Sequence, residues 1–209
     1  MEKLFITGIG TDIGKTIVSS IVVEALNADY WKPIQSGDLH LTDTMKVQSF
    51  VSNNTSVFHS EVYKFQNPLS PHAAAEIEKI RIDLEQIKLP QTNNRLIIEG
   101  AGGLMVPLND QHFIIDLIQK TDAEVILVSR NYLGSINHTL LTYELLKQRN
   151  IKIKGLIFNG NENMATENSI VNYTKLPVLL NINEEQLFTK EIVAAYAKSF
   201  LKNYKSSFV

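Results

Sequence analysis

Short apolar segments rich in β-branched residues recur along the chain and predict buried strands. The clearest are residues 4–7, 96–99, 125–129 and 153–158, with shorter ones at 30–31 and 178–180. Their residues are apolar at successive positions instead of alternating with polar ones, which is typical of parallel strands that are covered on both faces. The pattern therefore predicts a sheet buried between two layers.

Segments with helical spacing of apolar residues separate these strands. They are predicted at residues 15–27, 112–120, 135–149 and 190–204, with a less regular one after Asp43. Strands that alternate with helices predict an α/β fold with an open, doubly wound and mostly parallel sheet. Since no repeat, low-complexity tract or linker divides the sequence, we expect residues 1–209 to form a single domain. Ligands of such sheets bind beyond the carboxyl ends of the strands, where candidate chemistry should lie.

Composition narrows the classes of function. The 209 residues are 44% hydrophobic, enough for a full core, and a net charge of -2 with dispersed lysines and arginines favours small-molecule partners over nucleic acid. The absence of cysteine excludes disulfides, thiolate nucleophiles, iron-sulfur clusters and cysteine zinc sites. Without a signal-peptide pattern or an apolar run of about 20 residues, the sequence predicts a cytoplasmic protein with no membrane partner.

The strongest motif is the glycine-rich segment GIGTDIGKT at residues 8–16, between a predicted strand and a predicted helix. Phosphates bind the exposed N–H groups and the positive dipole end at such a helix start, so the motif predicts a phosphate-binding loop for a nucleoside triphosphate. Lys15 can reach the terminal phosphates, and the Thr16 hydroxyl can ligate Mg²⁺. The usual pattern has glycine where this chain has Ile9, with Gly8 one residue earlier, so the loop is a variant. The residues expected at the nucleotide are Asp12, Ile13, Gly14, Lys15, Thr16 and Ile17.

Three charged side chains follow other predicted strands. Glu99 ends a strand and precedes Gly-Ala-Gly-Gly, so its carboxylate lies at the carboxyl edge of the sheet. It is either a ligand of a metal ion or the solvated end of a strand. Asp43 stands before a helical pattern, and helix N-capping is about as well supported as metal ligation. Lys32 follows a short strand and points toward the same sheet edge, although most lysines are solvated surface charges.

Read together, these segments resemble the dethiobiotin synthetases, a P-loop family related to cobyrinate amidases, partition ATPases and nitrogenase iron protein. The resemblance extends over most of the chain. It rests on Thr7-Gly8 with Gly14-Lys15-Thr16, Lys32-Pro33 with Ser36-Gly37, Asp43, Ser70-Pro71-His72, Glu99-Gly100-Ala101-Gly102-Gly103 with Pro107-Leu108, Leu133-Gly134-Ser135-Ile136-Asn137-His138, and Asn159.

The resemblance implies a reaction and roles for these residues. Enzymes of this family use ATP and carbon dioxide to close a cyclic urea on 7,8-diaminopelargonic acid, through a carbamate and a carbamic-phosphoric anhydride. Lys15 and Lys32 are expected to neutralise the γ-phosphate and the carbamate. The other implied roles are substrate hydrogen bonds from Thr11 and Ser36, magnesium ligation by Thr16, Asp43 and Glu99, and nucleotide contacts from Gly100, Ala101, Gly102 and, at the base, Asn159.

The resemblance also implies a homodimer. Residues 133–138 open a predicted helix, and Gly134, Ser135 and Asn137 would bind the substrate carboxylate at the helix start of the neighbouring subunit. Two histidines, His72 and His138, are interpreted as structural and are left out of the catalytic set.

Two departures from the family pattern bear on the nucleotide site. Asp12 stands where many members carry glutamate, so any contact it makes is shorter by one methylene. Residues 179–183 lack the glycine and proline that often frame the base, so a preference for ATP is an assumption.

The main rival is a partition-type ATPase switch that binds a membrane or a protein partner. Such proteins carry a signature lysine where this chain has Gly10. The C-terminal segment 190–205 is basic and moderately amphipathic, but a core-packed terminal helix is the better interpretation. A corrinoid amidating synthase would need a cysteine-bearing glutamine domain, and the absence of cysteine excludes it together with an iron-sulfur protein.

Overall fold

The computed structural model describes residues 1–207 and is built around one seven-stranded sheet. Every neighbouring pair of strands in this sheet is parallel, and the spatial order is β4-β2-β6-β1-β7-β8-β9. The strands are β1 (Lys3–Gly8), β2 (Asp29–Trp31), β4 (Phe58–His59), β6 (Leu96–Glu99), β7 (Glu124–Arg130), β8 (Ile153–Asn159) and β9 (Val178–Ile182). A small parallel pair, β3 (Ile34–Ser36) and β5 (Tyr63–Phe65), lies beside it.

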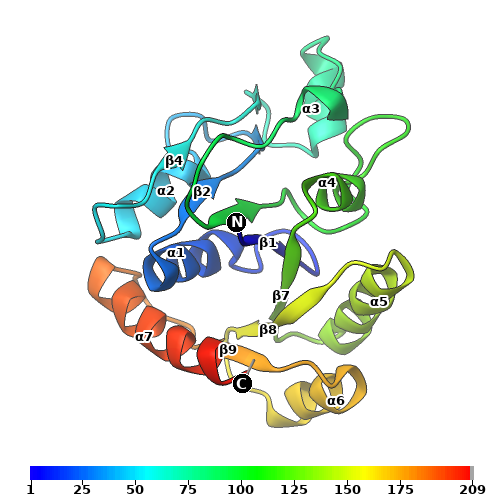
Figure 1. Ribbon diagram of the computed structural model, residues 1–209. Coiled ribbons are helices and arrows are strands. Elements are labelled where there is room, and N and C mark those ends of the chain that lie inside the picture. The colour runs from blue at the N-terminus through cyan, green and yellow to red at the C-terminus, as the bar shows by residue number, and fades with distance from the viewer. Residues whose placement is uncertain (208–209) are drawn as a thin grey trace.

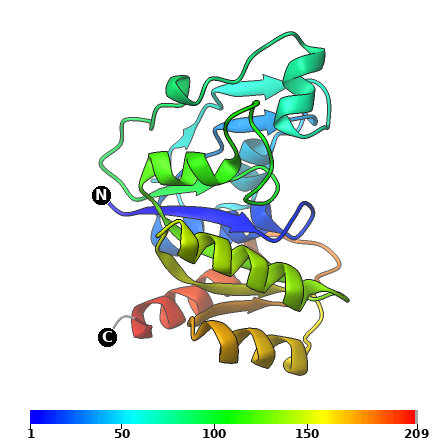
Figure 2. The ribbon, with the colours of Figure 1, turned by 90° about the vertical axis from the view of Figure 1, so that its right-hand side faces the viewer.

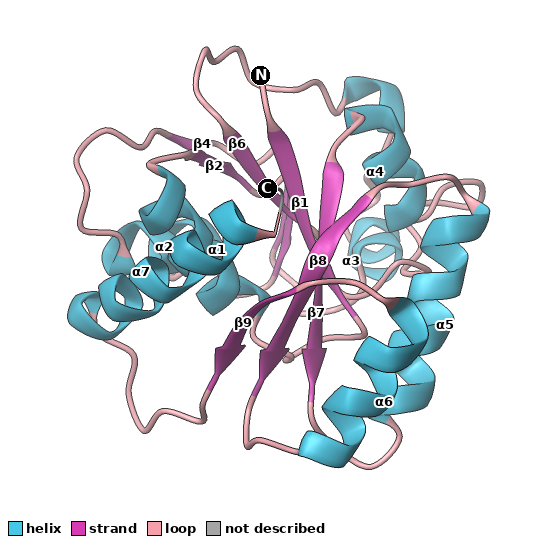
Figure 3. Ribbon diagram, turned by 60° about the horizontal axis from the view of Figure 1, so that its bottom comes forward, coloured by secondary structure: helices cyan, strands magenta, loops and turns pink. Residues whose placement is uncertain are grey.

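Helices cover both faces of the sheet (Figures 1 and 3). One face carries α1 (Lys15–Leu26), α2 (Asp43–Phe50) and α7 (Lys190–Ser206). The other carries α3 (Pro71–Ile77), α4 (Ile114–Thr121), α5 (Ser135–Gln148) and α6 (Met164–Thr174), of which α4, α5 and α6 lie on the side turned to the viewer in Figure 2. A short 3₁₀ turn, Leu84–Gln86, precedes β6.

Successive side chains of a strand point alternately into the two helical layers. In β1, Leu4 and Ile6 join the core under α1 and α7, whereas Phe5 joins the core under α3 to α6, and all three are fully buried. Because neighbouring side chains of a strand point to opposite faces, a strand buried on both sides must be apolar at every position. This confirms the physical basis on which the sequence predicted a doubly wound sheet.

Every predicted strand and helix is present, with ends that differ by no more than two residues. The sequence analysis did not find α3, α6, β3, β4 or β5. Helix α6 has a weak apolar pattern, and its start depends on the Asn163 side chain accepting a hydrogen bond from the Thr166 N–H group. Strand β4 is only two residues long and pairs at the sheet edge, so its sequence carries little periodic signal.

The strand order places the glycine-rich loop at the point where the chain reverses its direction of travel across the sheet. From β1 the chain builds β2, β4 and β6 on one side, and then β7, β8 and β9 on the other. A crevice opens at such a switch point beyond the carboxyl ends of the strands. Within residues 1–207, no helix is long and apolar enough to cross a membrane.

Candidate functional site

A cleft of about 1120 Å³ opens at this switch point. Thirteen of the residues predicted from sequence line it: Thr11, Asp12, Gly14, Lys15, Thr16, Ile17, Lys32, Ser36, Asp43, Glu99, Ala101, Gly102 and Asn159. They come from the loops after β1, β2 and β6, from the last residues of β3, β6 and β8, and from the starts of α1 and α2. The fold therefore brings together, in one cavity, groups that are up to 148 positions apart in sequence.

The glycine-rich loop wraps around the start of α1. Gly14 precedes the helix at φ +91°, and a Cβ atom there would collide with the Asn159 side-chain amide. That amide donates a 2.8 Å hydrogen bond to the Ile13 carbonyl, which ties the loop to the end of β8. Only glycine satisfies both the backbone angle and this close approach.

The variant spacing of the loop has a packing explanation. The Ile13 side chain is 4% exposed and packs in the core under α1, close above Gly8. A Cβ atom at residue 8 would overlap Ile13 and lie 3.0 Å from the Val128 carbonyl oxygen, whereas one at Gly10 would meet nothing within 4 Å. Glycine is therefore required one residue earlier than in the common pattern because Ile13 fills the space above it.

Lys15 is 8% exposed, and its ammonium donates a 2.7 Å hydrogen bond to the Gly10 carbonyl. Burial lowers the pKa of Lys15 to about 8, although the nearby Glu99 carboxylate favours the charged form. The ammonium thus lies over the concave side of its own loop, where a phosphate would bind.

Lys32 is buried between two carboxylates. Its Nζ contacts Asp43 Oδ2 and lies 3.4 Å from Glu99 Oε1, and the three side chains are 8%, 17% and 1% exposed. Burial by itself would lower the pKa of Lys32, but the charges of Glu99 and Asp43 outweigh it and hold that pKa above its ordinary value. The same ion pair outweighs burial at Asp43 and lowers the pKa of its carboxyl group. Lys32 is therefore a permanent cation rather than a solvated surface charge.

Glu99 accepts four hydrogen bonds. Its Oε1 faces Thr16 Oγ1 at 3.0 Å and Lys32, whereas its Oε2 accepts from Ser19 Oγ and Tyr30 OH, each at 2.8 Å. Burial, together with the charge of Glu99, raises the pKa of Tyr30 well above its ordinary value, so this hydroxyl stays a donor. These hydrogen bonds fix the Glu99 side chain, which is therefore not a solvated strand end.

The interpretation of Asp43 as a helix N-cap is wrong. Thr42 is the N-cap of α2, because its side-chain oxygen accepts a hydrogen bond from the Met45 N–H group. Asp43 is the first residue of the helix, with its carboxylate between Lys32 and Lys46 Nζ, the latter at 3.3 Å. Its carboxylate therefore lies at the cleft, paired with Lys32 and with a lysine of its own helix, and does not cap that helix.

The oxygens around Lys32 fit a magnesium ion. Asp43 and Glu99 supply carboxylates and Thr16 a hydroxyl, which is the hard oxygen set that Mg²⁺ takes when it also binds phosphates. The buried ammonium of Lys32 shows that these carboxylates stabilise positive charge. In residues 1–207 no three His, Cys, Asp or Glu side chains gather as a metal-binding group.

Other predicted residues lie away from Lys32 or outside the cleft lining. Ile13 and Gly100, expected at the nucleotide, do not line the cleft. The Ser36 hydroxyl lines the cleft, and its oxygen is buried without a hydrogen-bond partner in the described structure. Gly134, Ser135 and Asn137 do not line the cleft; they lie at the start of α5. There Ser135 is fully buried, and its hydroxyl likewise has no partner within residues 1–207.

The histidines make local contacts. His138 Nδ1 lies 2.7 Å from the Tyr132 hydroxyl, and His72 Nδ1 lies 3.1 Å from the Ser70 hydroxyl. Neither histidine lines the cleft.

The sequence analysis missed several parts of the site. One is the wall formed by Arg130, Gly160, Glu184, Glu185 and Phe188, next to Asn183 of the segment expected to frame the base. Arg130 joins this wall to the loop by donating to the Asp12 carbonyl and to Glu184, at 3.1 Å and 3.2 Å. A second group of lining residues is Gln35, Lys46, Phe50, Pro68, Leu69 and Val106. A third part is the pair Tyr30 and Ser19 behind Glu99. A polar Ser19 three positions after Thr16 in an apolar helix was a usable signal, but only the strand register reveals Tyr30.

Comparison with known proteins identifies similar chains. Residues 2–191 match the family model described as AAA domain. The chain is 56% identical to the ATP-dependent dethiobiotin synthetase BioD of Christiangramia forsetii, over 96% of this chain and 97% of the relative. It is 52% identical to the BioD protein of Cytophaga hutchinsonii, over 98% and 99% of the two chains.

Solved structures show similarity in fold at low sequence identity. A plasmid partition protein from Borrelia burgdorferi has a TM-score of 0.62 at 13% identity, with 98% of each chain covered. The cell division ATPase MinD from Pyrococcus furiosus has a TM-score of 0.60 at 16% identity, again with 98% of each chain covered. At such identities the likeness extends to the fold alone.

Proposed function

The chain belongs to the family of ATP-dependent dethiobiotin synthetases, and from that premise we propose how its cleft performs their reaction. The enzyme closes the cyclic urea of dethiobiotin on 7,8-diaminopelargonic acid, with carbon dioxide and ATP, in biotin biosynthesis. One amine forms a carbamate, the γ-phosphoryl group activates it as a carbamic-phosphoric anhydride, and the second amine displaces phosphate. The observation that carries the assignment of roles is the convergence of Lys15, Lys32, Asp43, Glu99 and Thr16 in one cleft at the switch point.

The glycine-rich loop binds the triphosphate in this proposal. The N–H groups from Asp12 to Ile17 face the phosphates at the start of α1, where the helix dipole favours anions. The Lys15 ammonium exchanges its hydrogen bond to the Gly10 carbonyl for phosphate oxygens. Ala101 and Gly102 form the opposite side of the phosphate site, whereas Gly100 packs against Phe5 and does not line the cleft. Asn159 lies toward the base, where it also fastens the loop.

Lys32 is the catalytic cation of the proposal. Carbamate formation and phosphoryl transfer both develop negative charge on oxygen, and a fixed cation in a water-poor cleft stabilises such charge more than solvent does. The raised pKa of Lys32 supports this role, because an ammonium that does not titrate near neutral pH cannot act as a base. Lys15 stabilises the charge that develops on the γ-phosphate.

Thr16, Asp43 and Glu99 would hold the magnesium ion. When bound, the ion would neutralise phosphate oxygens of the nucleotide. With the ion held there, Lys32 would give up part of its pairing with the two carboxylates, which would leave its ammonium available to the carbamate.

Thr11 and Ser36 position the diamine. Both line the cleft, and the unpartnered Ser36 oxygen supports a role as a hydrogen-bond partner for the substrate. Holding both amines next to the reacting carbon replaces a bimolecular encounter by a local one, which lowers the entropic barrier of ring closure.

We further propose that the chain, acting as one domain, works as a homodimer in the cytoplasm. The cleft is not lined by Gly134, Ser135 and Asn137, so these residues would bind the substrate carboxylate in the cleft of a second copy. Exposed apolar side chains just before α5, Tyr132 and Leu133, and in its middle, Leu141, support a subunit contact along this helix.

The direct test is product formation. Purified protein is incubated with ATP, magnesium, bicarbonate and diaminopelargonate, and dethiobiotin is sought by mass spectrometry. We expect dethiobiotin together with equimolar ADP. Absence of dethiobiotin, with or without turnover of another diamine, would overturn the assignment.

No observation favours the partition-type switch beyond its shared fold. Gly10 stands where the signature lysine would be, and α7 is packed against α1 through buried Val193, Ala197 and Phe200. ATP-dependent pelleting with liposomes would revive this alternative.

A further inference from the structure

The two carboxylate oxygens of Glu99 have different environments. Oε1 faces the cleft, where it meets the Thr16 hydroxyl at 3.0 Å and Lys32 Nζ at 3.4 Å. Oε2 lies on the far side of the carboxylate and accepts from Tyr30 OH and Ser19 Oγ, each at 2.8 Å. Tyr30 and Ser19 are fully buried and do not line the cleft, so these two contacts do not involve substrate.

The strand register explains why Tyr30 reaches Glu99. Tyr30 of β2 pairs with Ile97 of β6, and both side chains join the core under α1. Glu99 is two positions after Ile97 and therefore points to the same face of the sheet. The tyrosine ring extends along this face until its hydroxyl meets the carboxylate. Ser19, on the sheet-facing side of α1, donates the second hydrogen bond to the same carboxylate oxygen.

We propose that Tyr30, together with Ser19, is a positioning residue that fixes the Glu99 carboxylate with one oxygen presented to the magnesium ion of the nucleotide. The inference rests on the proposed role of Glu99 as a metal ligand and deepens it. Neither donor touches the substrates; each acts through Glu99.

The physical need for such donors comes from Lys32. The terminal torsion of a glutamate rotates easily, so a carboxylate with a free Oε2 could turn both oxygens toward the nearby ammonium. That geometry would pair Glu99 with Lys32 and withdraw it from the metal. Two neutral donors on Oε2 hold the carboxylate in place without cancelling the negative charge that the metal requires.

The loss of these two hydrogen bonds to Glu99 should have measurable consequences. Hydrogen bonds to metal-ligating groups orient the ligands, and their loss typically lowers metal affinity or activity by about 10-fold to 100-fold. The effect should appear in magnesium binding, and nucleotide binding without the metal should be spared, because the Tyr30 hydroxyl bonds to Glu99 and Tyr30 does not line the cleft.

The test is Tyr30→Phe, which keeps the buried ring and its contact with Phe58 and removes only the hydroxyl. The affinity for ADP is measured by isothermal titration calorimetry with magnesium and with EDTA, and the ratio of the two gives the coupling between magnesium and nucleotide. We expect this ratio to fall by about 10-fold, with the EDTA affinity unchanged. Ser19→Ala removes the other donor, tests the same arrangement if Tyr30→Phe does not fold, and should lower the ratio likewise.

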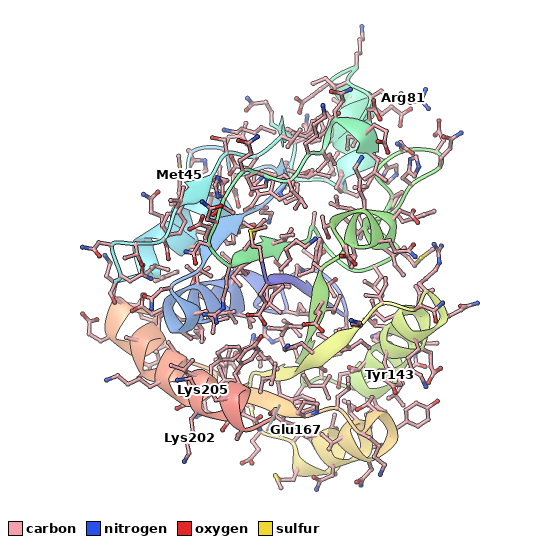
Figure 4. All side chains as sticks on the ribbon, in the orientation of Figure 1. Met45, Arg81, Tyr143, Glu167, Lys202 and Lys205 are labelled. Carbon is pink, nitrogen blue, oxygen red and sulfur yellow. The ribbon has the colours of Figure 1, made fainter. Side chains whose placement is uncertain are left out.

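Tyr143→Phe is the matched control. Tyr143 is also a buried tyrosine, but it lies on α5, away from the cleft, and donates to the Thr174 carbonyl (Figure 4). Its loss should leave the coupling ratio unchanged. Equal effects of Tyr30→Phe and Tyr143→Phe would overturn the inference.

Glu99→Gln separates the inference from the function on which it rests. If Glu99→Gln abolishes the coupling while Tyr30→Phe and Ser19→Ala preserve it, the positioning role is overturned and the metal role of Glu99 stands. If Glu99→Gln itself preserves the coupling, both the metal role and the inference are overturned.

Discussion

At the scale of single residues, the site depends on a lysine that the chain buries between carboxylates. A lysine on the surface would be solvated, but in the cleft Lys32 neutralises the charges of Asp43 and Glu99. Its role in stability and the catalytic role that we propose for it are therefore linked. Removal of one partner of a buried ion pair leaves an uncompensated charge, which is more costly than the loss of the pair itself.

Lys32→Ala should abolish dethiobiotin formation, with a loss of at least about 100-fold, because a preorganised charge is removed from the developing carbamate. It should also lower the free energy of unfolding without magnesium by about 3–5 kcal/mol, and magnesium with nucleotide should recover part of that loss. Product is measured by mass spectrometry, nucleotide affinity by calorimetry and stability by urea unfolding. Lys198→Ala, which removes an exposed lysine of α7, is the control for stability. Loss of nucleotide binding in EDTA would show that Lys32 serves the phosphates instead.

Asp29 gives a pH-dependent prediction. Burial would raise the pKa of its carboxyl group, but hydrogen bonds from Thr92, the Val57 N–H group and Asn94 outweigh burial and lower it. A lowered pKa means that the carboxylate stabilises the fold above its ordinary pKa of about 4, and that this stability is lost as the pH falls through the folded-state value.

Asp29→Asn should therefore destabilise the protein by about 1–3 kcal/mol at pH 7, and its difference from the wild type should shrink below about pH 4. Urea unfolding at a series of pH values measures both. Asp122→Asn alters an aspartate that is 97% exposed and should change stability little. A constant difference across the series would show that the charge of Asp29 is not the cause.

At the scale of elements, the glycine-rich loop is shaped by its contacts with neighbouring strands. Asn159 at the end of β8 bonds to the Ile13 carbonyl and lies against Gly14, so the loop is held by β8 as well as by α1. A side chain at Gly14 must displace this amide and accept a left-handed backbone.

Gly14→Ala should accordingly lower the free energy of unfolding of the nucleotide-free protein by about 1–3 kcal/mol, the usual range for a strained backbone position. Gly10→Ala, in the same loop but with open space at its Cβ, should lower it by less than about 1 kcal/mol. Urea unfolding of both variants tests the comparison. Equal losses would mean that the Asn159 contact does not constrain the loop.

Helix α7 tests the interpretation of the basic C-terminal segment. Phe200 is fully buried and stacks on Tyr204, so α7 belongs to the core under α1. Phe200→Ala should lower the free energy of unfolding by about 3–5 kcal/mol. Lys202→Ala, on the outer side of the helix (Figure 4), should change it by less than about 0.5 kcal/mol. A small effect of Phe200→Ala would favour a free amphipathic helix.

At the scale of the whole molecule, each active site of the proposed dimer would contain residues from both chains. Lys32→Ala and Gly134→Val should each be inactive, since one removes the catalytic cation and the other disrupts the start of α5. If Gly134 serves the cleft of the other copy, a mixed dimer of these variants has one intact site. Coexpression of the two should restore about a quarter of wild-type activity, because half of the random dimers are mixed. No restoration, together with a monomeric mass in solution, would contradict the dimer.

Sequence patterns were sufficient for the fold and for much of the cleft lining. Hydrophobic runs identify buried parallel strands, and the order of strand, glycine-rich loop and helix identifies the phosphate site, because these signals are local. The residues Lys15, Thr16 and Glu99 were placed correctly in the cleft for this reason. The sequence alone could not decide whether Lys32 is buried or whether Asp43 caps its helix, since each answer depends on groups far away in the chain.

By itself, then, the sequence determined the sheet, its layers and the edge at which chemistry gathers. Tertiary structure decided the partners: Lys32 between Asp43 and Glu99, and Tyr30 behind Glu99. The physical reason is that the burial of a side chain and its hydrogen-bond partners depend on which strands lie next to each other. The strand order sets β2 beside β6, and only that adjacency makes a tyrosine in one strand a support for a carboxylate in the other.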